Sequence, residues 1–297
     1  MGLFIINKSV PLPPWQWRQG SMENDKYMKL SIVLSLQPTR FSALAFQGNP
    51  EDHFQKLKTL GYDGVELAIR DPSLLNWDHL EEEVKTSGLN VPAIGTGQAY
   101  VEEGLRLSSP SAEIRKRAIE RIKSHILLAK RFQAAVIIGL IRGKVEKNED
   151  FREGYEWMME SLKSCCGEAE KENVSLWIEP LNRYETNLVN TLEEGEKVIE
   201  ELEAKNLALL ADTFHMNIEE KSIEESLKKS ILYLKHIHLA DSNRWAPGYG
   251  HIDFRMILNI LSAIQFNGFL SFEILPKPDP EKAAKKAIDF LRSLGKE

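Results

Sequence analysis

The sequence predicts an α/β fold, a single (β/α)8 TIM barrel. From Met28 onward, eight short apolar runs alternate with eight longer amphipathic segments. The short runs are almost continuously apolar, as is typical of parallel strands covered by helices. About 270 residues in this alternation match a TIM barrel in length and order. A doubly wound open sheet is the alternative, but the turn at residues 37–48 lacks a glycine-rich phosphate fingerprint.

The predicted strands and helices follow one another along the whole chain after the leader. The strands are expected at residues 29–36, 64–69, 91–97, 134–140, 174–180, 207–213, 234–241 and 269–275. The helices are expected at residues 50–61, 75–88, 111–131, 149–172, 191–206, 222–234, 253–268 and 280–295. Capping or turn residues mark several helix starts, among them Asn49 before Pro50, Thr191 and Asp253.

Composition restricts the class of protein. The chain has 297 residues, 42% hydrophobic and 28% charged, with a net charge of −6. This balance is typical of a soluble globular protein and argues against a broad surface for nucleic acid or for anionic membranes. No apolar stretch approaches the roughly 20 residues that span a bilayer. The two cysteines, Cys165 and Cys166, are adjacent and cannot pair as an ordinary disulfide, so we expect a reducing compartment, the cytoplasm.

Residues 1–27 do not resemble the rest of the chain. GLFII is too short for the core of a signal peptide and no small-residue cleavage site follows it. We interpret residues 1–27 as an N-terminal extension, native or added in cloning. The catalytic barrel is expected to span residues 28–297.

Ionisable side chains stand at the ends of four consecutive predicted strands. TIM-barrel enzymes carry their chemistry at the carboxyl ends of the strands. A charged residue in an apolar strand is costly unless it is paired or coordinated. We therefore expect these four side chains, called the ligand quartet below, to converge on one cation. The quartet consists of Glu179, Asp212, His238 and Glu273.

Three carboxylates and one imidazole form an oxygen-rich donor set. Such a set suits Mn²⁺, Mg²⁺ or Co²⁺ with open positions for a chelating substrate, whereas structural zinc prefers Cys or several His. His236 has the same parity as His238, so we expect it one layer deeper as a hydrogen-bonded core histidine. His251 is expected in a loop, and Asp253 at a helix N-cap.

The segments IEPLNRYE (178–185), ADTFHMN (211–217), HLADSNR (238–244) and SFEI (271–274) resemble the xylose-isomerase-like TIM-barrel superfamily. Within it they resemble the ketose 3-epimerases of the D-tagatose/D-psicose type. GTGQAY, IIGLIRG and ADSNRWAPGYGHIDFR are similar to the branch that epimerises 5-keto-L-gluconate. The resemblance covers the chain after Met28 and implies a divalent metal, usually Mn²⁺, held by the ligand quartet, and a dimer or tetramer.

The resemblance also implies roles for individual residues. Glu179 and Glu273 double as the acid/base pair, while Glu185, His215 and Arg244 match positions that hold the substrate. Epimerisation next to a carbonyl removes a proton from one face of a carbon and returns one to the other face. It therefore suits two carboxylates, one on each face, and a metal that stabilises the enediolate. A 1,2-isomerisation can manage with one base, so the pair alone does not decide.

Further polar residues follow the third, fourth and fifth predicted strands. Gln98 is expected to contact the substrate. Arg142 or Arg183 can bind a substrate carboxylate bidentately, which predicts a keto-hexonate or uronate in place of a neutral ketose. The alternative for both arginines is pairing with local acids. Phe41, Trp245 and other rim aromatics are expected in a lid or in a subunit contact.

Three rival functions remain at this point. An aldose–ketose or hydroxypyruvate isomerase is the nearest, and it differs in its product. A DNA-repair enzyme of the AP endonuclease IV type shares the superfamily, but it needs more metal-binding histidines than seven allow and a basic face. The third is a metal-stabilised barrel that binds a sugar without turnover. It leaves two inward carboxylates unexplained, because simple binding does not need them. The expected partner is a small sugar or keto acid, with no nucleic acid and no membrane.

Overall fold

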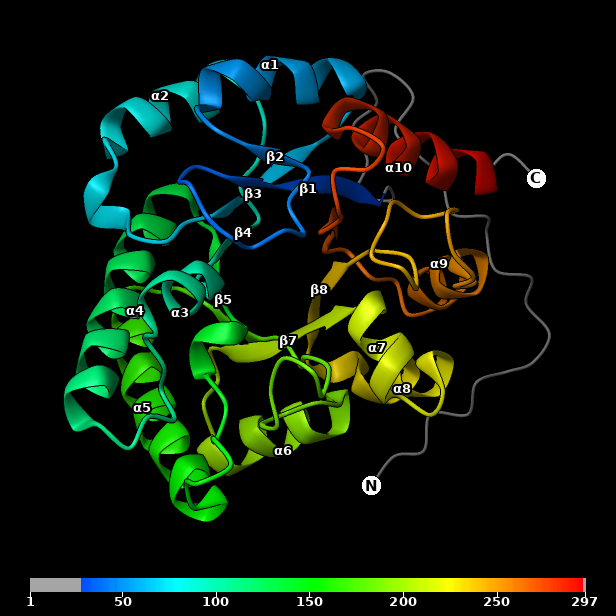
Figure 1. Cartoon of the computed structure of the whole chain (residues 1–297). Helices are drawn as coiled ribbons and strands as arrows, with labels where there is room; N and C mark the ends of the chain where they lie inside the picture. The colour runs from blue at the N-terminus through cyan, green and yellow to red at the C-terminus, as the bar shows by residue number, and fades with distance from the viewer. Residues whose placement is uncertain (1–27, 296–297) are drawn as a thin grey trace.

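Eight parallel strands close into a barrel within residues 28–295, the part of the chain that this computed structural model describes. The hydrogen-bonded order is β1-β3-β4-β5-β6-β7-β8-β9, and pairing of β1 with β9 completes the ring. Figure 1 shows the helices arranged around the outside of the strands. The predicted TIM barrel is confirmed. The predicted leader, residues 1–27, lies outside the described residues.

The strands are shorter than the apolar runs that predicted them, because the last residues of each run leave the sheet and enter the loops of the site. The strands are β1 (Lys29–Ser35), β2 (Phe46–Gln47), β3 (Gly64–Ala68), β4 (Ala93–Gly95), β5 (Ala135–Ile138), β6 (Leu176–Ile178), β7 (Leu207–Asp212), β8 (Leu234–His238) and β9 (Phe269–Phe272). The sequence did not predict β2, a two-residue strand that pairs with the end of β1.

All eight predicted helices are present, with shifted ends. The helices are α1 (Pro50–Leu60), α2 (Trp77–Ser87), α3 (Gly97–Glu103), α4 (Ala112–Phe132), α5 (Phe151–Lys171), α6 (Leu192–Leu202), α7 (Thr213–Glu219), α8 (Ile223–Lys229), α9 (Phe254–Ala263) and α10 (Pro280–Leu294), with short 3-10 turns at Pro72–Leu74, Leu140–Arg142 and Ser230–Leu232. Thr191 forms a capping box with Glu194, and Asp253 caps α9 as expected. Asn49 makes no side-chain cap bond, although Pro50 begins α1.

Most of the apolar core lies between the outer faces of the strands and the helices. The barrel interior holds a separate small cluster of Ala93, Ile137 and Leu210, against which Trp177 packs. Small and bulky side chains thus fill the barrel in layers. The layer nearest the carboxyl ends of the strands is polar, and that layer carries the site.

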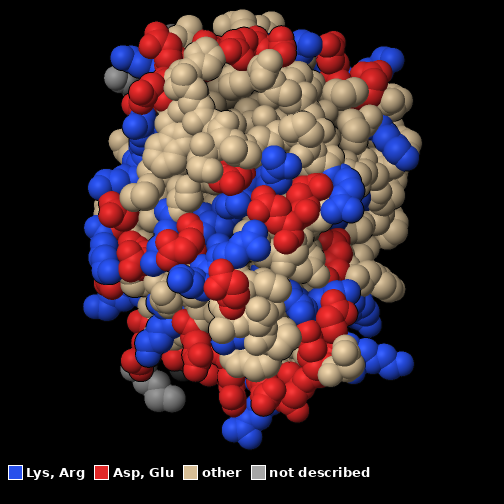
Figure 2. Space-filling model, turned by 60° about the vertical axis from the view of Figure 1, so that its left-hand side comes forward, with Lys and Arg blue, Asp and Glu red and all other residues tan. Residues whose placement is uncertain are grey.

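The surface agrees with the acidic composition. The face in Figure 2 carries basic and acidic side chains intermixed, not a basic stripe. Many charged side chains of the chain are paired, such as Arg121 with Glu103 and Arg131 with Asp78. No helix within residues 28–295 is both long enough and apolar enough to cross a membrane.

Two glycines of α5 provide a test of the packing. A Cβ at Gly154 would overlap Cγ2 of Val145, whereas a Cβ at Gly167 would meet no atom of residues 28–295 within 4 Å. We expect Gly167→Ala to raise the free energy of unfolding by about 0.5–1 kcal/mol through helix propensity. Gly154→Ala should lower it through overpacking, by about 1–3 kcal/mol. Urea titrations of both variants measure the difference, and equal effects would contradict the packing at Val145.

Candidate active site

The pairing register brings the ligand quartet together. Asp212 and His238 are directly opposite each other on β7 and β8. Glu179 and Glu273 follow two residues after Trp177 and Ser271, which point into the same barrel. One donor atom from each quartet member lies within 4.8 Å of the others. The sequence prediction that these four side chains converge is thus met by the structure.

Several donor atoms of the quartet form no hydrogen bond with any residue that the structure describes. They are Oε1 of Glu179, Oδ2 of Asp212 and Nδ1 of His238, and all three are buried. Nδ1 of His238 lies 3.2 Å from Oε1 of Glu179 and 3.9 Å from Oδ2 of Asp212. Buried polar atoms are almost always satisfied, so their convergence requires a further group. A divalent cation with oxygen and imidazole ligands fits this donor set.

Burial also changes the proton affinity of the quartet. Burial raises the pKa of Asp212 to about 6 and that of Glu273 to about 8, although the nearby Arg244 opposes both shifts. Against the effect of burial, Glu66 and Glu179 raise the pKa of His238 well above its ordinary value. Without metal, the quartet therefore binds protons, which reduce the repulsion among its carboxylates. A bound cation would replace these protons and neutralise the same negative charges.

Three members of the quartet, Glu179, His238 and Glu273, line a cavity that opens to solvent. Polar and apolar side chains together form its wall, as is typical of small-molecule sites. Gln98, expected to contact the substrate, lines the cavity and is 2% exposed. Its amide nitrogen donates to Oγ of Ser35 at 2.7 Å, and its buried amide oxygen has no hydrogen-bond partner among the described residues. That oxygen is free to accept a hydrogen bond from a ligand.

Arg244 holds two carboxylates at the cavity. Its Nη2 donates to Glu273 at 2.6 Å and its Nη1 donates to Glu185 at 3.0 Å. The guanidinium also lies 5.4 Å from the ring centre of Phe41 and 4.8 Å from that of Phe214. Arg244 has a φ of 61°, an unfavourable backbone state for a side chain of this size. Phe41 lines the cavity, whereas Trp245 packs on Tyr249 at 5.6 Å.

His215 is fixed in one orientation by Asn182, a residue that the sequence analysis did not single out. The backbone N–H of Asn182 donates to Nδ1 of His215 at 3.2 Å, and its side-chain amide donates to Glu185 at 3.0 Å. The proton of His215 therefore belongs on Nε2, which lies 3.8 Å from Asp212 and has no hydrogen-bond partner in the described part of the chain. Because burial lowers the pKa of His215 well below its ordinary value, this ring is a neutral hydrogen-bond donor.

Asp241 is a second residue that sequence reasoning missed. It is 1% exposed, and its carboxylate accepts hydrogen bonds from the backbone N–H groups of Ser242, Gly248 and Ile252. These bonds fold the loop that carries Arg244 against the barrel. The available signal was its place three residues after His238, at the end of the same apolar run. His251, as expected, lies in this loop, where its Nδ1 is 2.9 Å from Oγ of Ser242.

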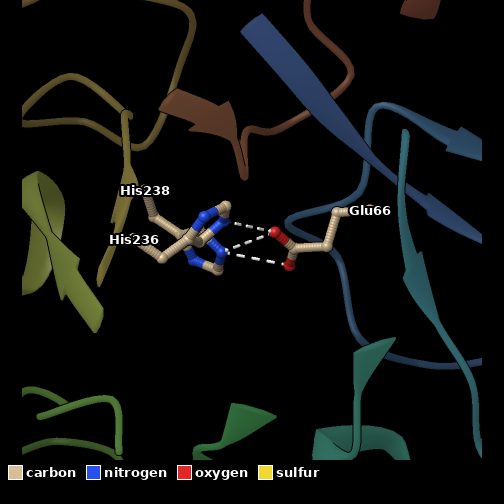
Figure 3. A group of neighbouring side chains, drawn as sticks. All are labelled: Glu66, His236 and His238. Atoms are coloured by element: carbon tan, nitrogen blue, oxygen red, sulfur yellow. Dashed lines mark hydrogen bonds and ion pairs between the residues drawn. The ribbon is translucent and has the colours of Figure 1, made fainter. Parts of the chain in front are cut away.

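Glu66 lies opposite the two histidines of β8 (Figure 3). Its Oε2 is 2.8 Å from Nε2 of His236, and its Oε1 is 3.0 Å from Nε2 of His238. His236 is therefore a hydrogen-bonded histidine of the barrel interior, as predicted. Although burial opposes ionisation, His238 and His236 hold the pKa of Glu66 below its ordinary value.

The expectation that Arg142 binds a substrate carboxylate is wrong. Its side chain is buried, and its guanidinium donates to the backbone carbonyls of Ile138, Gly139, Glu179, Leu188 and Val189. These five carbonyls occupy the guanidinium N–H groups that a substrate carboxylate would need. Arg183 forms an ion pair with Glu219 at 2.8 Å. Pairing with a local acid is the alternative to substrate binding that the sequence analysis gave for this arginine. Arg142 is a structural cross-link between the loops after β5 and β6.

We expect Arg142→Met to lower the free energy of unfolding by at least about 3 kcal/mol, because it orphans several buried carbonyls. Activity per folded molecule should fall equally on neutral and acidic substrates. Thermal and urea melts measure the first effect, with Arg183→Met as the exposed control, for which a much smaller change is expected. A selective loss on keto acids would restore Arg142 as a substrate ligand.

Gly139 tests the position of Glu179. A Cβ on Gly139 would lie 2.5 Å from Oε2 of Glu179, whereas a Cβ on Gly95 would lie no closer than 3.9 Å to its neighbour Ala68. We expect Gly139→Ala to displace the carboxylate and to weaken Mn²⁺ binding at least about tenfold, since a ligand is misplaced. Gly95→Ala should leave Mn²⁺ affinity unchanged. Titration of metal-free protein with Mn²⁺ compares the two, and equal affinities would contradict the placement of Glu179.

Comparison with known proteins agrees with the fold. Residues 54–294 match the family model described as xylose isomerase-like TIM barrel. A D-psicose 3-epimerase of Ruminiclostridium cellulolyticum is 30% identical over 229 residues, which cover 74% of this chain and 76% of the relative. A 3-dehydro-D-guloside 4-epimerase of Escherichia coli is 28% identical over 84% of this chain and 96% of the relative.

Solved structures give the same result. The structure of an L-ribulose 3-epimerase superposes with a TM-score of 0.77 at 27% identity, over 90% of this chain and 94% of that chain. The chain therefore belongs to the xylose isomerase-like TIM-barrel family, as the sequence predicted, and groups there with epimerases as an enzyme of the isomerase class.

Proposed function

We propose that the protein is a divalent-metal-dependent epimerase that inverts the carbon next to the carbonyl of a ketose or keto-hexonate. The observation that carries this proposal is the placement of Glu179 and Glu273 in one ligand group, on strands three apart around the barrel. Both carboxylates line one cavity, and they follow strands β6 and β9, which are three apart in the ring. The epimerase activities named for the relatives support the same reaction type.

The reaction needs one group to take a proton and another to return one. A substrate carbon held between Glu179 and Glu273 presents one face to each carboxylate, so one removes the proton and the other delivers a proton to the opposite face. Arg244 fixes Glu273 by a bond of 2.6 Å and so limits its rotation. Reversal of the two roles gives the reverse reaction.

A bound divalent cation supplies Lewis-acid stabilisation of the negative charge on adjacent substrate oxygens. The ligand quartet would hold it, and the carboxylate-rich donor set favours Mn²⁺, with Mg²⁺ and Co²⁺ as alternatives. Nε2–H of His215 and the guanidinium of Arg244 lie beside the quartet and can donate to the same oxygens. Glu185 and Gln98 can bind substrate hydroxyl groups.

The charge of the cavity bears on the substrate class. Among the described residues that line it, Arg244 is the one with a Lys or Arg side chain, and it already pairs with Glu185 and Glu273. With Arg142 engaged elsewhere, a substrate carboxylate has no dedicated arginine in this cavity. Neutral ketoses and keto acids therefore have to be compared directly.

We expect the Mn²⁺-loaded enzyme in D₂O to place deuterium at C3 of D-psicose or D-tagatose, or at the matching carbon of 5-keto-gluconate, as followed by NMR. Glu179→Gln and Glu273→Gln, assayed at saturating Mn²⁺, should each lose about 10²–10⁴-fold in rate because each lacks one proton-transfer group. Glu219→Gln serves as a control outside the cavity. Removal of the metal with a chelator should abolish exchange.

Other products would contradict the proposal. An aldose product with deuterium at C1 or C2 would identify a 1,2-isomerase. Full activity after chelation would exclude a role for the metal. A cytoplasmic location and a dimeric or tetrameric assembly remain predictions from the sequence.

A further inference from the structure

Glu66 connects two histidines from across the barrel. It belongs to β3, while His236 and His238 belong to β8, and β1 and β9 lie between these strands in the sheet. All three side chains are at most 2% exposed. Figure 3 shows the carboxylate pointing at both rings. The contact therefore spans the barrel interior and is not a pairing of neighbours.

The geometry determines which nitrogen of His238 carries a proton. A carboxylate accepts hydrogen bonds, so the Nε2 atoms of His236 and His238, at 2.8 Å and 3.0 Å from Glu66, must each donate. When His238 is neutral, its lone pair is therefore on Nδ1. That atom has no hydrogen-bond partner within residues 28–295 and lies 3.2 Å from Oε1 of Glu179, within the ligand quartet.

The ring beyond Glu66 is itself held in place. His236 stacks on Trp177 with ring centres 5.0 Å apart and an interplanar angle of 23°. It meets His238 edge to face, with ring centres 5.3 Å apart. His236 therefore cannot turn freely, and its hydrogen bond fixes one oxygen of Glu66. The order of support runs from Trp177 through His236 and Glu66 to His238.

We propose that Glu66 is a positioning residue that fixes the tautomer and ring orientation of His238, so that Nδ1 is presented to the metal, and that His236 orients Glu66 for this purpose. The inference rests on the proposed metal dependence and goes beyond it, because neither Glu66 nor His236 belongs to the ligand quartet. In metal sites, a carboxylate bound to the outer nitrogen of a histidine ligand typically changes metal affinity by about 10–100-fold.

The test measures metal binding directly. Metal-free wild type, Glu66→Gln, His236→Gln and the control Glu219→Gln are titrated with Mn²⁺, and free Mn²⁺ is followed by EPR. Glu219 is a matched control because its carboxylate is only 6% exposed but pairs with Arg183 away from the barrel interior. We expect Glu66→Gln to bind about 10–100-fold more weakly, His236→Gln to lose less, and Glu219→Gln to match wild type.

Thermal melts of each protein without metal and with added Mn²⁺ separate a positioning role from a general effect on stability. A positioning role predicts that Mn²⁺ raises the melting temperature of Glu66→Gln less than that of wild type. A purely structural role predicts lower melting temperatures with an unchanged Mn²⁺ affinity, and that result would overturn the inference. Two ions bound per chain would also overturn it, because Glu66 would then be a metal ligand.

The wild-type protein provides a readout that does not depend on any variant folding. NMR of ¹⁵N-histidine in the Mg²⁺-loaded enzyme should show His238 protonated at Nε2 alone. A proton on Nδ1 would refute the inference even if the proposed epimerase activity is found. Wild type that fails to bind Mn²⁺ at all would instead refute the proposed function.

Discussion

Burial of ionisable groups at one end of the barrel is the constraint on which the rest of the structure depends. The ligand quartet places three carboxylates and an imidazole, largely removed from water, within 4.8 Å of one another. Such a group is costly unless opposite charge or protons are supplied. The raised pKa values of Asp212 and Glu273 express that cost, and Arg244 offsets part of it. The fold already holds these mutually repelling ligands together, so a cation that binds here relieves their repulsion without first having to assemble them.

The structure around the quartet supplies hydrogen bonds to buried polar groups that have no access to water. Arg142 uses its guanidinium to cross-link backbone carbonyls, including that of Glu179 itself at 2.6 Å. Asn182 fixes His215, and Asp241 folds the loop that holds Arg244. In each case a buried polar side chain bonds to backbone or to a site residue. The rigidity of the site thus comes from hydrogen bonds to the loops after the strands, more than from the strands themselves.

The strands and the ligand quartet could be predicted because both follow from local pattern. An apolar run that ends in an acid or a histidine identifies the strand and the end that faces the cavity, so Glu179 and Asp212 needed no knowledge of distant residues. The short elements β2, α3 and α7 lie within loops and have no hydrophobic period of their own. Arg142 was misplaced because its position after a strand resembles that of a ligand. Three of its five acceptors, the carbonyls of Glu179, Leu188 and Val189, are distant in sequence and are brought near only by the tertiary fold.

The two nitrogens of His238 show why a complete site needs tertiary information. Parity along β8 places His236 and His238 inside the barrel, and sequence alone goes no further. Glu66 reaches them from a strand about 170 residues earlier in the chain, at a separation that no local pattern encodes. Because Nε2 of His238 is occupied by this carboxylate, Nδ1 is the nitrogen left for the quartet. In the proposed metal site, the side of the ring that would bind the cation is therefore set by Glu66, which lies outside the quartet. This contact exists only when β3 and β8 face each other across the closed barrel.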